Sequence, residues 1–250
     1  MINILTLKVG VKYGADYINK LYNSIKRNTN VPFIMYCYTD DRSGIISDVR
    51  TIDLKLRDHV KAQFYKIDFH NMPTIAGKCL ILDIDYVIVQ NIDQILDWPL
   101  AQGQFGCHLR WWSYAELQRH NGCKINGGFQ MFYQGDTVDL YAKFNSNPSY
   151  WQSYYINNRL AYGQLNGEQN FIDQHVTLER SWLPEYWFGK YSDSQLENDM
   201  IALYWDHSID DTNDYFLGDR FDPRVKMIHF ANSSNKIENH NEPWIDQHWH

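Results

Sequence analysis

The hydrophobic pattern of the chain alternates between short apolar runs and longer amphipathic segments. Residues 2–8 form a run of the strand type, and residues 15–27 carry apolar side chains spaced three and four apart, which predicts a helix with one buried face. Residues 33–38 predict a second strand, and residues 49–54 predict a third. This alternation is typical of a mostly parallel sheet with crossover helices.

The remainder of the chain is expected to continue the alternation with shorter elements. Apolar runs predict further strands at residues 80–82, 87–89, 105–109, 125–133 and 225–230. Helical spacing predicts further helices at residues 58–70, 91–98, 136–144, 150–160 and from residue 167 onward. Residues 182–223 show no clear periodicity, which indicates a long functional loop or a mobile lid.

The length of the chain favours a single domain. Its 250 residues are enough for one well-buried α/β domain, and a second full domain would be cramped. We therefore expect one domain over residues 1–237, with a mostly parallel central sheet flanked by helices. Residues 238–250 are polar, and we expect them to form a poorly ordered tail.

Two acids follow one of the apolar runs directly. Residues 80–82 are too few for a helix and predict a strand buried on both faces, and Asp83 and Asp85 come after it with only Ile84 between them. In open α/β sheets, ligands bind at the carboxyl ends of the strands. Two carboxylates there supply oxygen ligands suited to Mg²⁺ or Mn²⁺ and leave room for phosphate oxygens. The pair therefore predicts a metal-diphosphate site.

A structural explanation of the same pair has to be weighed against this one. Asp is common where strands end, because its side chain caps turns. Here, however, a second apolar run resumes at residue 87, and burying acids between two such runs is costly unless they are paired or bind a metal. We therefore favour a functional pair.

Charge and cysteine content narrow the possible partners and compartment. The net charge of -7 gives no basic surface for a nucleic-acid backbone, so nucleic acid is not an expected partner. Cys37 and Cys79 lie inside apolar runs, as reduced core thiols do. The first residues read as a strand rather than a leader, and no window is apolar enough to span a bilayer. We expect a cytoplasmic protein without an integral membrane segment.

Other segments offer candidate ligand contacts. Lys66 lies near the end of the predicted helix that leads to the acids, and Gly127 and Gly128 allow the backbone to approach a ligand closely, although a β-bulge would also need glycine. Glu168 and Gln169 begin a helix, where they either meet a sugar or phosphate or act only as caps. Aromatic content of 16% supports stacking on sugars or bases, but such residues also fill cores.

A zinc site is a further, weaker possibility. Cys107, His108, His120 and Cys123 are close in sequence, but an adjacent Cys-His pair lacks the usual ligand spacing. We interpret these as ordinary residues.

Taken together, the segments resemble glycosyltransferase family 8, the glycogenin and bacterial galactosyltransferase group, with its single GT-A (Rossmann-like) domain. Residues 78–93, which contain Asp83 and Asp85, are similar to the Asp-x-Asp segment of that family. The other matches occur in the order of the family: Thr6-Leu7 with Tyr13, Lys66, Asn126-Gly127-Gly128, Glu168-Gln169 and the segment around His229. The resemblance covers about residues 2–237, and its ordering is more specific than any single motif.

The resemblance implies roles for these residues. Asp83, Asp85 and His229 would hold Mn²⁺ or Mg²⁺, and Glu168 and Gln169 would lie near the reactive face of the sugar as catalytic residues. The implied donor-binding residues are Thr6, Leu7, Tyr13, Lys66, Ile84, Asn126, Gly127 and Lys236. The implied reaction moves a sugar from a UDP-sugar to an unknown acceptor, expected to be a carbohydrate, with retention at the anomeric carbon.

The chain departs from the family pattern at several positions. Asn232 and Ile237 replace a glycine and a proline after His229, Lys236 stands one residue late, and Glu168 replaces an Asp. Two alternatives therefore stay open. A haloacid-dehalogenase-type phosphohydrolase would use Asp83 as nucleophile and Asp85 as acid and base, but that segment normally opens the chain. A nucleotide-sugar-binding protein without turnover is the other alternative.

Overall fold

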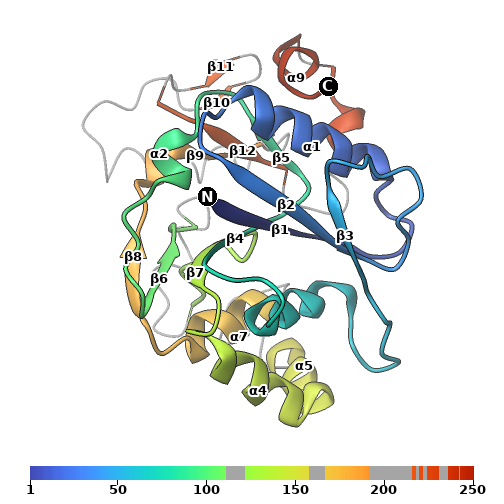
Figure 1. The fold of residues 1–250 in the computed structure, drawn as a ribbon, viewed down its shortest axis with the longest axis vertical. Helices are drawn as coiled ribbons and strands as arrows, with labels where there is room; N and C mark the ends of the chain where they lie inside the picture. The colour runs from blue at the N-terminus through green and yellow to red at the C-terminus, as the bar shows by residue number, and fades with distance from the viewer. Residues whose placement is uncertain are drawn as a thin grey trace.

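The structure, a computed structural model, describes residues 1–110, 122–157, 167–191, 216–217, 220–221, 224–230, 236–241 and 243–250. Within these residues a seven-stranded sheet forms the centre of the molecule (Figure 1). Its strands, in spatial order, are β3 (Arg50–Asp53), β2 (Phe33–Thr39), β1 (Ile2–Lys8), β4 (Lys78–Leu82), β7 (Phe129–Tyr133), β6 (Gln104–Cys107) and β8 (Glu179–Trp182). β7 runs antiparallel to both of its neighbours, and the other pairings are parallel.

Helices cover both faces of this sheet. α1 (Ala15–Arg27) lies on one face, and η1 (Ala62–Asn71), α4 (Val138–Ser146), α5 (Pro148–Asn157) and α7 (Gly167–His175) lie on the other (Figure 1). The described residues contain four further short helices: α2 (Asp93–Leu96), η2 (Glu185–Trp187), η3 (Ile237–Asn239) and α9 (Pro243–His248). The arrangement is the mostly parallel α/β sheet that the hydrophobic pattern predicts.

A second sheet and a hairpin complete the described elements. The second sheet has three strands within the described residues, in the order β5 (Tyr86–Ile88), β12 (Met227–His229) and β9 (Phe188–Lys190). The hairpin pairs β10 (Phe216–Leu217) with β11 (Arg220–Phe221). Because β5 follows β4 after a turn of three residues, the second sheet begins where β4 ends.

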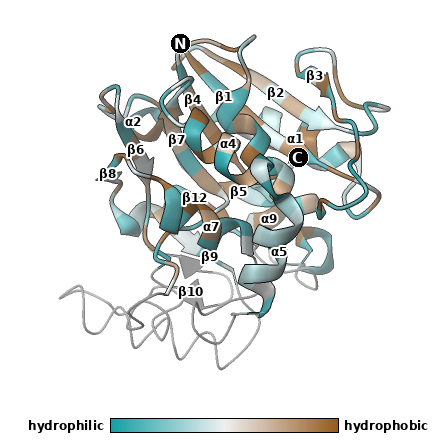
Figure 2. Ribbon diagram, turned by 90° about the horizontal axis from the view of Figure 1, so that it is seen from below, coloured by the Kyte–Doolittle hydropathy of each residue, from teal (hydrophilic) through white to brown (hydrophobic). Residues whose placement is uncertain are grey.

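The strands are apolar because both faces of the sheet are covered. Ile2, Ile4 and the apolar face of α1 belong to one core cluster, while Leu5 and Ile81 belong to the other, against η1 and α7. Figure 2 shows the corresponding hydrophobic colouring along the central strands. Each covered face removes apolar surface from water, which is the main favourable term in folding. The buried Cys37 and Cys79 thiols lie in these clusters, in agreement with the prediction of core cysteines.

Two elements differ from their sequence prediction for local reasons. The helix expected at residues 58–70 begins only at Ala62 and is a 3₁₀ helix. All residues from Phe64 to His70 are buried, so the segment lacks the solvent-facing side of an amphipathic α-helix. The strand expected at residues 125–133 begins at Phe129, because the Asn126 side-chain oxygen accepts the Gly128 N–H at 2.8 Å and turns the chain there.

The expectation of a disordered polar tail was wrong for the described residues after 242. Residues 243–248 form α9, and Trp244, Ile245 and Trp249 are buried. Arg27 of α1 donates to the His250 and His248 carbonyls at 3.0 and 2.9 Å. The polar composition concealed these three apolar residues, of which Trp249 packs against Tyr17 of α1 and Trp244 lies against Tyr191 and Phe230.

The irregular segment at residues 182–223 is ordered at its start. Residues 185–190 form η2 and β9. Most of the segment in which a lid was expected, residues 192–215, lies outside the described residues. Among the described residues, no helix combines the length and apolar character needed to cross a bilayer.

Candidate metal and nucleotide-sugar site

The two acids lie in the turn that joins β4 to β5. β4 ends at Leu82 and β5 begins at Tyr86, so the turn consists of Asp83, Ile84 and Asp85. The Asp83 N–H donates to the Gly128 carbonyl at 2.9 Å, which extends the pairing of β4 with the chain before β7. Ile84 is buried in the core and anchors the turn between the two acids. This places both acids at the carboxyl end of a central strand, as predicted.

The pairing of β12 with β5 brings His229 to this turn. Tyr86 and His229 are register partners in the antiparallel ladder, and the Phe230 N–H donates to the Asp85 carbonyl at 2.9 Å. His229 Nε2 lies 3.1 Å from Asp85 Oδ1 and 3.8 Å from Asp83 Oδ2. One ligand atom from each of Asp83, Asp85 and His229 lies within 4.8 Å of the others. Residues far apart in sequence therefore form one compact cluster.

Two neighbours hold the His229 ring. The ring stacks on Tyr86 with centroids 4.3 Å apart, and Asn126 Nδ2 lies 3.1 Å from His229 Nδ1. The same Asn126 nitrogen donates to the Tyr86 hydroxyl at 2.7 Å. His229 thus presents Nε2 to the acids, while its Nδ1 faces the side-chain amide of Asn126.

Lys66 connects the cluster to α7. Its ammonium lies 2.9 and 3.0 Å from the two Asp83 oxygens and 3.0 Å from Glu168 Oε1. Burial alone would lower the pKa of Lys66, but Asp83 and Glu168 raise it above its ordinary value. Burial raises the pKa of Glu168, and Lys66 opposes that rise. Glu168 Oε2 has no hydrogen-bond partner within the described residues.

The charges of this group fit a divalent cation. Within the described residues, the three carboxylates of Asp83, Asp85 and Glu168 lie around one ammonium in direct contact, that of Lys66 with Asp83 and Glu168. Burial opposes ionisation of Asp85, yet His229, Lys66 and Lys12 lower its pKa below the ordinary value. Carboxylate oxygen and imidazole nitrogen together are ligands that Mn²⁺ accepts. The backbone is shaped to leave room, since a Cβ at Gly128 would stand 2.6 Å from Asp83 Oδ2 and 3.1 Å from His229 Cε1.

The predicted catalytic residues lie at the start of α7, beside the glycines. The Gly127 N–H donates to Gln169 Oε1 at 3.2 Å, and a Cβ at Gly127 would stand 2.6 Å from Gln169 Cβ. Glycine is needed here because a Cβ would collide with the Gln169 side chain. Glu168 and Gln169 are therefore held next to Gly127, and Lys66 connects Glu168 to Asp83.

Two of the predicted donor-binding residues, Tyr13 and Lys236, lie close together. The Tyr13 hydroxyl donates to Asp85 Oδ2 at 3.3 Å, and burial together with Asp85 raises the Tyr13 pKa well above its ordinary value. Lys236 Nζ lies 5.7 Å from the centre of the Tyr13 ring and also pairs with Glu238 at 3.3 Å. Thr6 and Leu7 lie on β1 and pair with Cys37 and Tyr38 of β2. The hydrogen bond to Asp85 connects Tyr13 to the metal cluster. Thr6 and Leu7 lie on β1, the strand that precedes Tyr13.

Two site residues were not predicted from the sequence. Lys12 Nζ lies 4.5 Å from the centre of the Tyr13 ring, so two lysines flank that ring beside Asp85. Its position in the loop after the first strand was a usable signal, because such loops border the ligand edge of the sheet. Tyr86 stands between Asp85 and the apolar run at residues 87–89, and nothing in the sequence indicated that it would hold Asn126 and His229.

The zinc alternative receives no support from the described residues. Cys107 and His108 are buried, and the His108 ring stacks on Phe188 with centroids 3.8 Å apart. Burial lowers the pKa of His108 to about 3, with the Leu109 carbonyl opposing. His120 lies outside the described residues. His108 is explained as a neutral core histidine.

Comparison of the sequence with known proteins found no match: no family model matches it, and no curated protein matches it. Solved structures do match. A galactosyltransferase, LgtC, in complex with donor and acceptor sugar analogs has a TM-score of 0.58 at 11% identity, covering 92% of this chain and 87% of its own. Mouse xyloside xylosyltransferase 1 has a TM-score of 0.57 at 12% identity, covering 93% and 98%.

A third match is the glycosyltransferase GlyE of Streptococcus pneumoniae TIGR4. Its TM-score is 0.58 at 14% identity, and the alignment covers 96% of this chain and 56% of GlyE. At such low identity the likeness concerns the arrangement of the chain and not its chemistry. The protein has the GT-A fold of these glycosyltransferases, with an Asp-x-Asp pair at the carboxyl end of a central strand.

Proposed function

We propose that the protein is a metal-dependent glycosyltransferase that takes a sugar from a UDP-sugar and passes it to a carbohydrate acceptor. The observation that carries the proposal is the cluster of Asp83, Asp85 and His229, with Lys66 beside it, at the ligand edge of a GT-A sheet. A likeness in fold to three sugar transferases supports the same reading. The resemblance of the sequence motifs to glycosyltransferase family 8 points the same way.

Mn²⁺ or Mg²⁺ would be held by Asp83, Asp85 and His229, and when bound it would offset the charge of the departing diphosphate. The chain itself supplies further positive charge. Lys66 is fixed by Asp83 and Glu168, while Lys12 and Lys236 flank Tyr13 next to Asp85. Preorganised cations of this kind stabilise negative charge as it develops, because they need no reorganisation during the reaction.

The remaining residues position the donor. Tyr13 offers an aromatic face for the uracil, and Thr6 and Leu7 of β1 would lie beside the uracil. Asn126, Gly127 and Ile84 border the sugar and diphosphate. A glycine at 127 lets the backbone approach a ligand closely, and the residue is already in contact with Gln169.

We assign different roles to the two residues at the start of α7. Glu168 is buried, and its Oε1 is bound to Lys66, so it positions that lysine. Gln169 is held by the Gly127 N–H at the position where the sugar would lie, and we propose that it faces the reactive carbon of a retaining enzyme. No carboxylate in this arrangement is assigned as a nucleophile.

The phosphohydrolase alternative is less well supported. It needs Asp83 free to attack phosphate, but both Asp83 oxygens are in contact with Lys66.

The experiment is a panel of UDP-sugars incubated with Mn²⁺, with and without simple glycan acceptors, and read as UDP release. We expect metal-dependent release from one donor, accelerated by acceptor, and a product with the donor's anomeric configuration by NMR. UDP binding without release from any donor would support the binding-protein alternative. Phosphate release from phosphate esters without UDP-sugar turnover would support the phosphohydrolase.

A further inference from the structure

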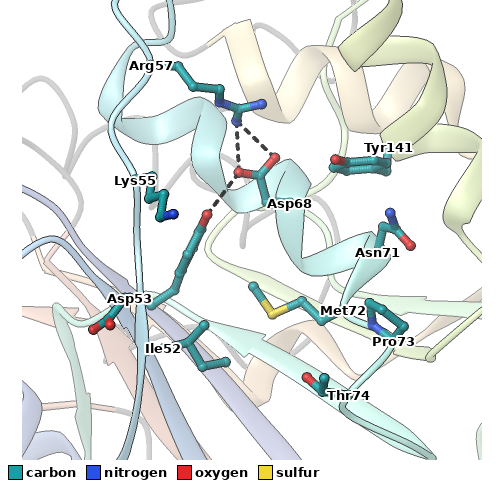
Figure 3. Close-up of a pocket in the computed structure, with 11 residues that line it drawn as sticks. Ile52, Asp53, Lys55, Arg57, Asp68, Asn71, Met72, Pro73, Thr74 and Tyr141 are labelled. Carbon is teal, nitrogen blue, oxygen red and sulfur yellow. Dashed lines mark hydrogen bonds and ion pairs between the residues drawn. The ribbon is translucent and has the colours of Figure 1, made fainter.

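A cavity of about 410 Å³ lies away from the metal cluster, between the β3 edge of the sheet, η1 and α4 (Figure 3). None of Asp83, Asp85, His229, Glu168 or Gln169 lines it. Its volume is within the range of about 300 to 1,000 Å³ that is usual for small-molecule sites. It is therefore large enough for a ligand and has no role in the function proposed above.

The cavity combines an apolar lining with aromatic rings. Ile52, Met72 and Pro73 supply apolar surface, and Tyr141 of α4 lies on the side opposite the β3 residues (Figure 3). Tyr38 of β2 also lines the cavity. A tyrosine ring offers an apolar face for the C–H groups of a sugar and a hydroxyl for its oxygens.

Polar groups at the cavity are of two kinds. Arg57 Nη2 donates to both Asp68 oxygens at 2.9 and 2.8 Å, and Arg57 Nη1 donates to Asn145 at 2.6 Å, so this pair is fixed. A second set is available: within the described part of the chain, no hydrogen bond engages the side chains of Asp53, Lys55, Asn71 and Thr74, which also line the cavity. The cavity thus offers both donors and acceptors to a ligand.

The charges around the cavity are balanced. Asp53 and Asp68 face Lys55 and Arg57. A phosphate or carboxylate ligand would compete with Asp68 for Arg57 and would meet Asp53, while a cation would compete with Arg57 for Asp68. The first arrangement would leave Asp68, whose side chain is 12% exposed, without its partner, which is costly, and the second would break the two contacts that Arg57 makes with Asp68. A neutral ligand rich in hydroxyl groups avoids this cost.

We propose that this cavity binds a neutral saccharide, and that it is a glycan-binding site separate from the metal cluster. The saccharide would be a segment of the acceptor, and only this part of the proposal rests on the proposed function. η1 lies between the two sites: Lys66 reaches the acids and Asp68 lines the cavity. Two residues apart on a 3₁₀ helix of three residues per turn, these side chains leave the helix on different sides.

The test measures glycan binding without nucleotide and in EDTA, so that the metal site contributes nothing. Neutral oligosaccharides of glucose, galactose and N-acetylglucosamine are compared with a sialylated and a chitosan oligosaccharide by saturation-transfer NMR and titration. Tyr141→Ala removes one ring and Thr74→Trp fills the cavity. Tyr150→Ala, an exposed tyrosine on α5 outside the cavity, is the matched control.

We expect a neutral glycan to bind and both cavity variants to weaken it by at least about fivefold, with Tyr150→Ala and Asp85→Asn unchanged. Absence of binding, preference for a charged glycan, or wild-type affinity in both Tyr141→Ala and Thr74→Trp would overturn the proposal. Loss of binding in Asp85→Asn, or displacement by UDP with Mn²⁺, would place the glycan at the metal site instead.

The outcome is separable from that of the proposed function. Glycan binding at the cavity without turnover of any UDP-sugar would leave this proposal standing and reject the transferase. Turnover of a UDP-sugar without any effect of Tyr141→Ala or Thr74→Trp on glycan binding would support the transferase and reject glycan binding at the cavity.

Discussion

Lys66 divides its charge between Asp83 and Glu168, and this division affects how strongly the cluster attracts a metal. When Asp83 turns toward a cation, Glu168 still holds the ammonium 3.0 Å away. Without the Glu168 charge, Lys66 would pair with Asp83 alone and compete with the metal. A buried lysine is stabilised by each carboxylate that it keeps.

This reasoning gives a prediction for Glu168→Gln. We expect Mn²⁺ affinity to fall by about tenfold, since one charge-assisted contact contributes about 1.5 kcal/mol. Titration of free Mn²⁺ by electron paramagnetic resonance measures it. Glu179→Gln, on β8 at the edge of the sheet, is the control and should bind as the wild type does. Unchanged affinity in Glu168→Gln would show that Lys66 is not shared in the way described.

Asn126 determines which tautomer of the His229 ring its surroundings favour. As placed, Asn126 Nδ2 donates to the Tyr86 hydroxyl and faces His229 Nδ1, so Nε2 carries the proton and donates toward Asp85. A metal at Nε2 needs the other tautomer, with the proton on Nδ1. The amide must then turn its oxygen to His229, giving up the Gly128 N–H that it now accepts.

We therefore expect Asn126→Asp to tighten Mn²⁺ binding by about tenfold, because a carboxylate accepts the Nδ1 proton and the Gly128 N–H together. Calorimetry of Mn²⁺ binding measures the change. Asn126→Ala, which offers no acceptor, is the comparison and should bind Mn²⁺ more weakly than the wild type. Weaker binding in Asn126→Asp than in Asn126→Ala would contradict this view of the tautomer.

At the scale of elements, η1 carries a buried histidine, His70, next to its last residue. Burial lowers the pKa of His70 to about 3, although Gln130 opposes the shift. The ring packs on Phe132, and Nδ1 lies 2.9 Å from the Thr137 hydroxyl. In the unfolded chain the pKa would be about 6.5. Because the folded pKa is the lower one, neutral His70 stabilises the fold above pH 6.5, and this contribution is lost as pH falls toward 3.

His70→Asn should make stability less dependent on pH in that window. We expect the slope of the unfolding free energy between pH 6 and 4 to decrease by about 1.4 kcal/mol per pH unit relative to wild type. Urea unfolding at several pH values measures the slope. His59→Asn, an exposed histidine, should leave the slope unchanged. Equal slopes in His70→Asn and wild type would mean that His70 is protonated in the folded state.

The hydrophobic pattern was informative for two kinds of element. α1 has the predicted bounds because it has one buried and one exposed face, and β1 has them because it is a short run buried on both faces. η1 was mistaken for an α-helix, since a segment buried on all sides carries no amphipathic signal. The turn at Asn126 to Gly128 was missed in detail, because it depends on a side chain that bonds its own backbone.

At the scale of the whole molecule, the chain after residue 236 stabilises α1 from outside. Trp249 packs edge-on against Tyr17 with ring centroids 5.4 Å apart, and it is 6% exposed. Ser24 and Arg27 bond to the His248 carbonyl. Tyr17 in turn contacts the Tyr13 ring at 4.7 Å, so this packing reaches the edge of the proposed donor site.

Removing this tryptophan should destabilise the fold. Trp249→Ala is expected to lower the unfolding free energy by about 3 kcal/mol, the usual cost of a large buried side chain. Trp182→Ala is the matched control, because that side chain is 40% exposed at an edge strand and should cost under about 1 kcal/mol. Chemical denaturation of both variants compares them. Similar small losses would mean that residues 243–250 do not pack stably on α1.

Part of the candidate site could be predicted from the sequence. Asp83 and Asp85 stand out because an apolar strand ends in them, and His229 was assigned by resemblance to a family segment; the structure brings all three together. The pairing of Tyr86 with His229 and the sharing of Lys66 with Glu168 depend on register between distant strands and helices. Local pattern does not encode that register.

The central claim is that the Asp83, Asp85 and His229 cluster joins a divalent metal to a nucleotide diphosphate. Titration calorimetry of UDP with Mn²⁺ and with EDTA tests it most directly, in the wild type, in Asp85→Asn, and in Asp97→Asn as a surface control. We predict that Mn²⁺ strengthens UDP binding by at least about a hundredfold in wild type and Asp97→Asn, and that this gain disappears in Asp85→Asn. Equal UDP affinity in Mn²⁺ and EDTA, or a full metal effect in Asp85→Asn, would contradict the account.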